Sequence, residues 1–358
     1  MTVRAPAPMQ LLDETIRRIR PIDPCWIDRA SRHQLELTKP PGSLGRLEEL
    51  ANRCAAIRES LAPGVARPRI VLFAADHGVC AEGVSPYPQA VTAQMVLNFL
   101  RGGAAINALA GVGGIELKVI DVGVATPIPA SNGLLSRRAA PGTRNFCAEP
   151  AMTESEMTAA LNTGIEFACD SANEGCELLG FGEMGIGNTT VASAITAAIT
   201  GEPVNAVVGC GTGADEACMV RKRSAVQRGL LLHNESLQDA LGILRCLGGL
   251  EIAAMCGFCL GAAAHRLPVV MDGFIATAAA TLAVHLCPAT SGYLFASHYS
   301  AEPGHRHLLA QLGQKPLLCL DMWLGEGTGA ALAMKLIQAA VAAFTNMATF
   351  AAAGVSNR

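Results

Sequence analysis

Apolar runs and helix-like segments alternate through the middle of the chain. The apolar runs cover residues 70–75, 117–123, 177–182, 205–209, 267–273 and 292–297. The helix-like segments lie at residues 90–109, 154–176, 190–199, 215–233 and 250–264. Continuous apolar runs of this length are typical of strands that are buried on both faces. The alternation therefore predicts a doubly wound α/β fold, with a mainly parallel, Rossmann-like sheet and helices on both of its faces.

The two ends of the chain have a different pattern. Residues 1–66 are helix-like, with an amphipathic segment at 47–61, and residues 328–353 are helix-like as well. Two helical ends that flank a sheet can pack on each other. We therefore expect a large α/β domain with the active site at residues 67–325, and a small helical domain built from residues 1–66 and 326–358.

The composition narrows the class of protein. Of the 358 residues, 51% are hydrophobic and only 16% are charged, with a formal net charge of −3. So low a charged fraction indicates a large core or an oligomer that hides surface, and the lack of a basic stripe argues against nucleic-acid binding. The uncharged segment 336–357 is rich in alanine and contains Gln338 and Thr345. This favours a buried helix over a membrane span.

Targeting and redox signals are weak. The first residues contain no apolar signal segment, which predicts that the protein is not secreted. The 13 cysteines are scattered, and Cys256 and Cys259 form a CxxC pair without a second pair of ligands at zinc spacing. We expect reduced cysteines in a cytoplasmic protein that has no metal site.

Glycine-rich turns before helix-like segments provide the candidate chemistry. Residues 182–190 follow one apolar run and residues 209–215 follow the next, with Lys222 further along the second helix. Glycines let a ligand approach the backbone closely, and a helix N-terminus binds phosphate. Two such turns favour a phosphorylated ligand, although a tight turn capped by Asn188 or Thr189 would explain the first one equally well.

The first turn also has a competing interpretation. Gly180, Gly182 and Gly185 match the GxGxxG fingerprint, which keeps an NAD-dependent dehydrogenase as an alternative. The match is weak because Glu183 would place a carboxylate inside the pyrophosphate turn. In addition, at least two apolar runs precede this one, whereas the fingerprint belongs on the first strand of its unit.

A third glycine-rich turn, at residues 324–329, contains Glu326 between two glycines. A carboxylate in this place can act as a general base with open backbone around it. It can also be an acidic residue that is favoured by the dipole of the following helix. Burial would raise its pKa and the dipole would lower it, so the sequence leaves the net shift open.

Two histidines follow apolar runs. His77 stands between Asp76 and Gly78, and His298 stands near Ser300. No cluster of metal ligands accompanies His77 in the sequence, so we interpret it as a structural hydrogen-bonding residue. A Ser-His-Asp hydrolase is disfavoured because the chain contains no GxSxG motif.

Several segments occur in the order of one known family. They cover residues 39–48 (KPPGSLGRLE), 75–79, 82–84, 91–93, 101–102, 119–123, 183–190, 267–269, 272–274, 297–298, 300–302 and 324–332. On these segments the chain resembles the nicotinate-nucleotide–dimethylbenzimidazole phosphoribosyltransferase family, over most of its length.

The resemblance implies a reaction. A ring nitrogen of dimethylbenzimidazole attacks the anomeric carbon of nicotinate mononucleotide, nicotinate leaves, and inversion gives an α-linked riboside phosphate used to assemble cobalamin. Glu326 matches the general base of the family, which removes the imidazole proton during the attack. The resemblance also implies a homodimer, no metal and no bound cofactor.

The resemblance also assigns binding roles. Glu183 matches an acidic residue near the bases and the ribose, and Leu324 would pack on the aromatic ring. Other residues would contact the phosphate, the ribose or the benzimidazole: Tyr87, Met95, Met184, Gly185, Ile186, Gly187, Asn188, Gly211, Thr212, Lys222, Gly273 and Ser300. The pair Met322-Trp323 is bulkier than the family pattern and is a local departure.

Two other functions remain alternatives. A nucleotide N-glycosidase on the same scaffold would let water attack the ribose, with Glu326 as the base. A non-catalytic carrier would bind a benzimidazole or its riboside without turnover. The preferred aromatic base depends on the shape of the pocket, because one methyl group is worth only about 1–3 kcal/mol.

Overall fold

A six-stranded parallel sheet lies at the centre of the protein. The structure is a computed structural model that describes residues 9–129, 131–211 and 213–356. The strand order is β3-β2-β1-β4-β5-β6, and each neighbouring pair is parallel. The strands are β1 Pro68–Ala75, β2 Glu116–Gly123, β3 Leu134–Ser136, β4 Leu178–Met184, β5 Val269–Met271 and β6 Leu294–Ala296. The prediction of a doubly wound, parallel α/β fold is confirmed.

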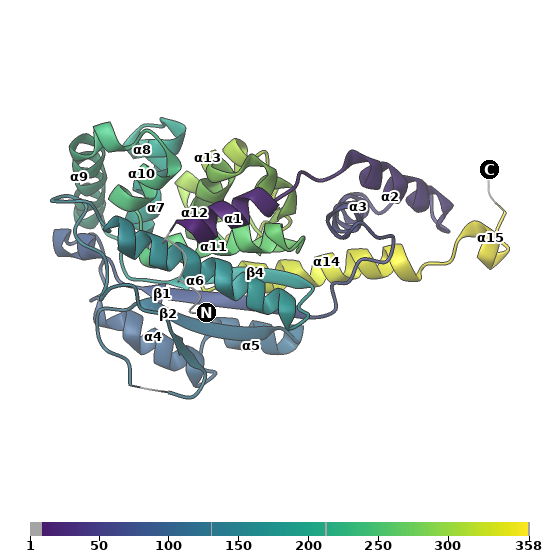
Figure 1. Ribbon diagram of the computed structural model, residues 1–358, viewed down its shortest axis with the longest axis horizontal. Helices are drawn as coiled ribbons and strands as arrows, with labels where there is room; N and C mark the ends of the chain where they lie inside the picture. Colours follow the sequence, from purple (N-terminus) through teal and green to yellow (C-terminus); the bar gives the residue numbers. More distant parts are fainter. Residues whose placement is uncertain (1–8, 130, 212, 357–358) are drawn as a thin grey trace, which may run out of the picture.

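Helices cover both faces of this sheet. Figure 1 shows α4 (Ala90–Leu100) and α5 (Ala105–Gly113) below the strands, with α6 (Glu154–Asn173) and α11 (Leu250–Ala264) above them. Every residue of α11 up to Ala263 is buried. Apart from Glu251, its sequence is apolar all round, as expected for a helix that is packed on every side.

The remaining helices surround this core. They are α1 Gln10–Arg18, α2 Pro24–Glu36, α3 Arg46–Arg58, α7 Asn188–Thr200, α8 Val204–Val207, α9 Glu216–Leu232, α10 Ala240–Leu247, α12 Phe274–Leu286, α13 Pro303–Leu312, α14 Thr328–Asn346 and α15 Phe350–Ala353. Three 3-10 helices are η1 Gly78–Glu82, η2 Asn234–Ser236 and η3 Pro288–Tyr293.

Three elements of the structure differ from the prediction made from the sequence. The run 205–209 is not a strand: residues 205–207 belong to the short helix α8, and the place beside β4 is occupied by β5, which pairs Val269 with Leu179. The strand β3 was missed because a three-residue edge strand carries too little periodicity. The expected helix 90–109 is two helices, since Gly102 has a φ of +77° and the chain turns there.

The two ends of the chain meet away from the sheet. Figure 1 shows α14 running from beside β4 toward α2 and α3, with α15 at the far end. Leu37 forms an antiparallel bridge with Thr349, and the N–H of Thr38 donates to Ala348 at 3.1 Å. The first half of α14 also packs on β4 and β5. These contacts support a unit built from both ends, and the exact division into two domains stays a prediction.

The segment 336–357 differs from its prediction. It is not one buried helix, because α14 ends at Asn346 and the residues of α15 are not buried. By length and composition alone, α14 and the stretch Ala90–Gly113 could each cross a membrane. The apolar part of α14 is 56% buried inside the protein, as is also usual for a core helix of a globular protein.

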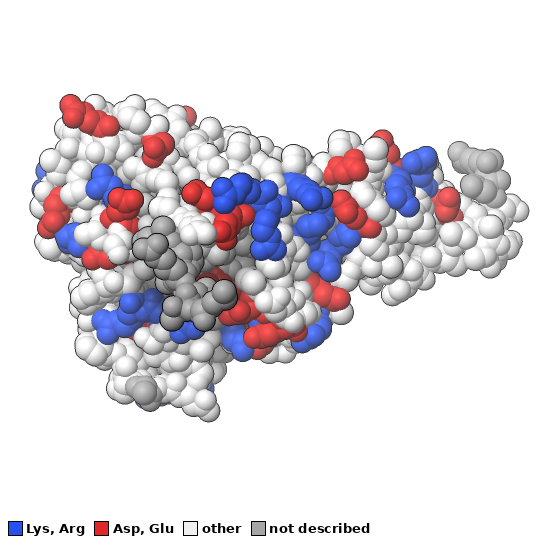
Figure 2. Space-filling view, in the orientation of Figure 1, with Lys and Arg blue, Asp and Glu red and all other residues white. Residues whose placement is uncertain are grey.

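Charged side chains are unevenly distributed over the surface. On the face drawn in Figure 2, basic side chains gather over the middle with acidic ones beside them. A separate depression of the surface is lined by Arg17, Arg18, Arg20 and Arg266, together with Glu59. The lowest part of this face, at and below α4 in Figure 1, carries few charged side chains, whereas acidic and basic side chains lie at the level of α5.

Candidate active site

Glu326 stands in a tight turn immediately before α14. Its φ is +61°, and the φ angles of Gly325 and Gly327 are also positive. The turn packs directly on β4, where a Cβ added to Gly182 would clash with the backbone of Glu326 and Gly327. Asp272, which follows β5, accepts hydrogen bonds from the N–H groups at the start of α14. The turn is therefore fixed from two neighbouring strands.

The environment of Glu326 suits a proton acceptor. The side chain is buried, and its Oε2 atom has no hydrogen-bond partner among the residues that the structure describes. Burial raises the pKa of Glu326 to about 7, and the nearby negative charge of Asp272 adds to the shift. A carboxylate whose pKa lies near neutral pH can take a proton during a reaction and release it again.

Glu183 lies beside Glu326 near the end of β4. A Cβ on Gly325 would clash with Oε1 of Glu183, so the Glu183 carboxyl packs directly against the turn that carries Glu326. The amide of Asn188 donates to Oε2 of Glu183. Burial, and then the charges of Asp272, Glu251 and Glu326, raise the pKa of Glu183 well above its ordinary value. These effects favour the protonated form of Glu183.

The glycine-rich turn after β4 connects this carboxyl pair to α7. The φ of Gly187 is +96°, and α7 begins at Asn188. The N–H of Ile186 donates to the hydroxyl of Thr92 at 3.1 Å, and the N–H of Asn188 donates to Gly185 at 3.1 Å. Both N–H groups are thus used inside the protein, and the turn is rigid.

Lys222 forms a polar cluster with the second glycine-rich turn. This lysine of α9 is 1% exposed, and its Nζ donates to Gly209 at 2.7 Å and to Thr189 at 3.2 Å. Burial lowers the pKa of Lys222, against the opposing charge of Glu302. The N–H of Gly211 donates to Glu302 at 2.8 Å. Thr212, which was predicted to bind phosphate with Gly211, lies outside the described residues.

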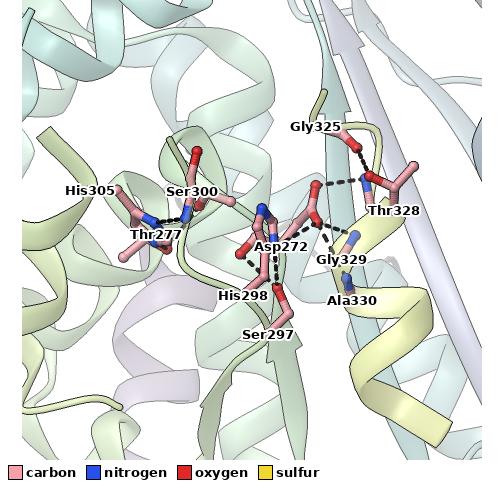
Figure 3. A network of polar contacts seen from close by, with 12 residues as sticks. Asp272, Thr277, Ser297, His298, Ser300, His305, Gly325, Thr328, Gly329 and Ala330 are labelled. Carbon is pink, nitrogen blue, oxygen red and sulfur yellow. Dashed lines mark hydrogen bonds and ion pairs between the residues drawn. The ribbon is translucent and has the colours of Figure 1, made fainter. Parts of the chain in front are cut away.

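Gly273 and Ser300 lie next to a buried histidine network. The N–H of Ser300 donates to Nδ1 of His305 at 2.9 Å, and Thr277 lies 2.9 Å from the other ring nitrogen (Figure 3). Burial lowers the pKa of His305 to about 3, so this ring is neutral. A Cβ on Gly273 would lie 3.3 Å from the ring of His298.

His77 forms a buried ion pair that the sequence did not reveal. Its Nε2 lies 2.8 Å from Glu251, and both side chains are fully buried. Burial alone would lower the pKa of His77, but the Glu251 carboxylate outweighs it and the pKa is raised. A Cβ on Gly185 would lie 3.0 Å from this ring. His77 therefore supports the turn after β4, in agreement with a structural role.

An apolar cavity of about 760 Å³ opens next to Glu326. This volume lies in the usual range for small-molecule sites. Six of the predicted site residues line the cavity together: Tyr87, Met95, Met184, Ile186, Leu324 and Glu326. Val91, Ala105, Leu109, Leu320, Asp321, Met322, Trp323 and Thr328 complete its wall. The site thus has an apolar half and a polar half, with Glu183 and Glu326 where they meet.

The other predicted residues lie in the polar half. Gly211, Lys222, Gly273 and Ser300 do not line the apolar cavity, but Thr189 connects Lys222 to the turn that carries Asn188. Sequence reasoning assigned no role to Asp272, Glu251 or Glu302. Asp272 had a usable signal, because it directly follows an apolar run, whereas Glu251 and Glu302 lie within helix-like or loop segments.

The structure removes the basis of the dehydrogenase alternative. Gly180 and Gly182 lie inside β4 and not in a turn. A Cβ on Gly180 would lie 2.7 Å from Met334 of α14, and one on Gly182 would clash with Gly327. These glycines are needed for close packing of α14 and its turn on the sheet, so they are not a dinucleotide fingerprint.

Metal and redox chemistry have few candidate residues. Within the described part of the chain, no group of three or more His, Cys, Asp or Glu side chains could hold a metal ion. All 13 cysteines lie in the described ranges and are free thiols. Cys256 and Cys259 are fully buried in α11, and burial raises the pKa of each thiol.

Comparison with known proteins identifies the family. A phosphoribosyltransferase family model matches residues 19–355. The nicotinate-nucleotide–dimethylbenzimidazole phosphoribosyltransferase of Chloroflexus aggregans is 51% identical over 98% of this chain and 99% of its own length. The protein of the same name from Geobacter metallireducens is 50% identical, over 97% and 98%. A crystal structure of this phosphoribosyltransferase from Thermus thermophilus superposes with a TM-score of 0.88 at 50% identity, and covers 94% of this chain and all of that one. This chain therefore belongs to that phosphoribosyltransferase family.

Proposed function

We propose that this protein transfers ribose 5-phosphate from nicotinate mononucleotide to 5,6-dimethylbenzimidazole. The products are α-ribazole phosphate and nicotinate. The observation that carries the proposal is a buried carboxylate, Glu326, with a pKa of about 7 at the wall of an apolar cavity. The named relatives, about 50% identical over nearly the whole chain, agree with this activity.

The chemistry follows from this placement. A ring nitrogen of the bound base attacks the anomeric carbon, and the bond to nicotinate breaks with its electron pair moving onto the pyridinium nitrogen. Nicotinate leaves without needing a proton, because its ring nitrogen becomes neutral. Glu326 takes the proton from the other imidazole nitrogen, so no charge builds up on the new riboside. Holding both substrates in line contributes the rest of the acceleration.

The polar half of the site suits the nucleotide. Lys222 is a buried cation that bonds to Gly209 and Thr189 of the glycine-rich turns, and the start of α7 adds the dipole of a helix N-terminus. Gly273 follows β5 and Ser300 follows β6, and the Ser300 hydroxyl accepts from the N–H of Glu302, whose charge acts on Lys222. We assign phosphate and ribose binding to this half, and the aromatic base to the apolar half.

Oligomeric state and location are part of the proposal. Tyr87, Leu320, Trp323 and Leu324 are about half exposed at the rim of the apolar cavity. A second copy of the chain that covered this rim would bury it, so we propose a homodimer in the cytoplasm. Sedimentation of the purified protein tests this: a monomer at micromolar concentration would overturn the dimer.

One assay separates the candidate activities. Purified protein is incubated with nicotinate mononucleotide, with and without dimethylbenzimidazole, and the products are separated by chromatography. We expect α-ribazole phosphate and nicotinate to appear together, only when the base is present. Nicotinate without added base would identify an N-glycosidase, and binding without any product would identify a carrier.

The Glu326→Gln variant tests the base. We expect its kcat to fall by roughly 10²- to 10⁴-fold, the usual contribution of general base catalysis. The KM for nicotinate mononucleotide should change little, because Glu326 faces the aromatic cavity. Glu154→Gln, at an exposed position of α6 outside the cavity, is the matched control. Equal activity of Glu326→Gln and the wild type would exclude Glu326 as the base.

A further inference from the structure

We infer that Asp272 is a positioning residue, whose carboxylate fixes the turn of Glu326 relative to the ribose side of the site. The inference rests on the proposed function, and it assigns a role to a residue that does not itself touch the substrates.

The carboxylate of Asp272 caps a helix that belongs to another part of the chain. Asp272 follows β5 directly, yet it accepts from the N–H of Gly327 at 2.9 Å, of Gly329 at 2.8 Å and of Ala330 at 3.2 Å. Figure 3 shows these bonds crossing from Asp272 to the start of α14. The side chain is 2% exposed.

The start of α14 needs this external cap. Helices have N–H groups without partners in their first turn, and a side chain at the N-cap usually accepts from them. The N-cap residue of α14 is Gly327, which has no side chain. The backbone of Glu326 is left-handed with a φ of +61°, a strained conformation for a residue with a Cβ. The bonds to Asp272 hold the turn in this conformation.

His298 fixes the distance between the two halves of the site. A Cβ on Gly329 would clash with the His298 ring, and one on Gly273 would lie 3.3 Å from it. The ring is therefore packed between the starts of α14 and α12. Its Nδ1 lies 2.9 Å from the hydroxyl of Ser297, which donates to the backbone oxygen of Asp272 at 3.0 Å. Asp272 and Gly273 thus tie both helix starts to one buried ring.

Asp272 also acts on Glu326 through its charge. The acidic groups whose charges interact with Glu326 are Asp272 and Glu183, Asp321 lines the same cavity, and Nδ1 of His298 lies 3.9 Å from Asp272. Because like charges disfavour ionisation, removal of the Asp272 charge should lower the pKa of Glu326 from about 7 toward its ordinary value of 4.5. Burial of Glu326 would remain, so the decrease should be partial.

The Asp272→Asn variant tests the inference, with the pH profile of kcat/KM as the readout. The amide keeps the size of the side chain but loses the charge, and one of its two ends can no longer accept from the N–H groups of α14. We expect kcat to fall on the order of 10²-fold, as for a misplaced catalytic group. The KM for nicotinate mononucleotide should stay within about threefold, and the acid limb of the profile should move to lower pH.

Asp121→Asn is the matched control. Asp121 is a buried carboxylate at the end of β2 that accepts from the N–H of Val124 at 2.8 Å, away from Glu326. We expect this variant to lose thermal stability and to keep the acid limb of the wild type. If Asp272→Asn behaves in the same way, with an unmoved acid limb and activity that falls only with the folded fraction, Asp272 has a merely structural role and the inference is wrong.

A second measurement does not depend on turnover. The pKa of the Glu326 carboxyl can be followed by ¹³C NMR of the side chain, with Glu326→Gln identifying the resonance. A lower pKa in Asp272→Asn than in the wild type supports the inference, and an equal pKa overturns its electrostatic part. If the wild type forms no riboside phosphate, the proposed function fails, and this titration still decides whether Asp272 controls Glu326.

Discussion

The two ends of the same sheet differ in whether their buried charged side chains have partners of opposite charge. At the amino end of β1, Arg69 is 4% exposed and bonds to Glu116 at 2.9 Å, to Glu174, and to Ser171 at 3.1 Å. At the carboxyl ends of β4 and β5, Glu183 and Asp272 lie close to Glu326, and in the described part of the chain no ion pair with lysine or arginine is found for them.

This difference distinguishes charged groups that stabilise the fold from carboxyl groups that can exchange a proton during a reaction. Burial would raise the pKa of Glu116, but hydrogen bonds from Lys118 and Arg69 lower it overall. Nothing comparable compensates burial at Glu326, whose pKa rises to about 7. Paired charges stay ionised at all ordinary pH values, whereas an unpaired buried carboxyl exchanges protons near neutrality. Perturbed carboxyl groups in a cleft are therefore candidates for catalysis.

The largest expected effect is a gain of stability in Glu326→Gln. A pKa raised from 4.5 to about 7 means that the folded protein holds a proton on Glu326 that the unfolded chain releases. Stability of the wild type therefore falls as pH rises from 4.5 to 7. At pH 8 we expect Glu326→Gln to be more stable by up to about 3 kcal/mol, and near pH 4.5 the difference should vanish. Urea denaturation at both pH values measures this difference in the free energy of unfolding. If Glu326→Gln is less stable than the wild type at pH 8, the pKa of Glu326 is not raised by burial.

The next largest effect is expected for Lys222, the buried cation near the carboxyl ends of the strands. Lys222→Met removes a buried ammonium group from the glycine-rich turns, and we expect the KM for nicotinate mononucleotide to rise roughly 10- to 100-fold. The KM for dimethylbenzimidazole should change much less. Arg223→Met is the control, because Arg223 lies on the same helix and pairs with Glu216. An unchanged KM for the nucleotide would place phosphate binding elsewhere.

At the amino end, Arg69→Met should lower stability without altering catalysis. Glu116 and Glu174 are about half exposed, so both can turn to water once the guanidinium is lost. The loss should therefore be only about 1–2 kcal/mol. The kcat per folded molecule should equal that of the wild type, and active-site titration combined with denaturation measures both quantities. A large fall in kcat would show that the two ends are coupled.

The smallest effect concerns the apolar half of the site. Leu324→Ala removes part of the cavity wall, and we expect the KM for dimethylbenzimidazole to rise by about tenfold at most. Val112→Ala, at a position 92% exposed on α5 and outside the cavity, serves as the control. Equal KM values for Leu324→Ala and the wild type would mean that the aromatic base does not contact Leu324.

The strands of the sheet were predictable where they are long. The runs that became β1, β2 and β4 are buried over most of their length, so their sequences are predominantly apolar. The run at 205–209 has the same composition, yet its residues 205–207 belong to α8, and the place beside β4 is occupied by β5. Short apolar runs do not distinguish strand from helix by pattern alone.

The resemblance to a family placed the site residues in order, and the structure brought six of them to one cavity. The sequence could not place Asp272, because its role depends on α14, more than fifty residues further along the chain. The His77–Glu251 pair was hidden for the same reason, since its members come from segments far apart in the sequence.

By itself, the sequence determined the alternation of strands and helices, the glycine-rich turns and the identity of the acid at position 326. These features depend on residue size, polarity and backbone freedom, which act locally. The tertiary structure decided which groups are charged and available. Burial and the distance between carboxyl groups set the pKa of Glu326, and both arise only when β4, β5 and α14 come together.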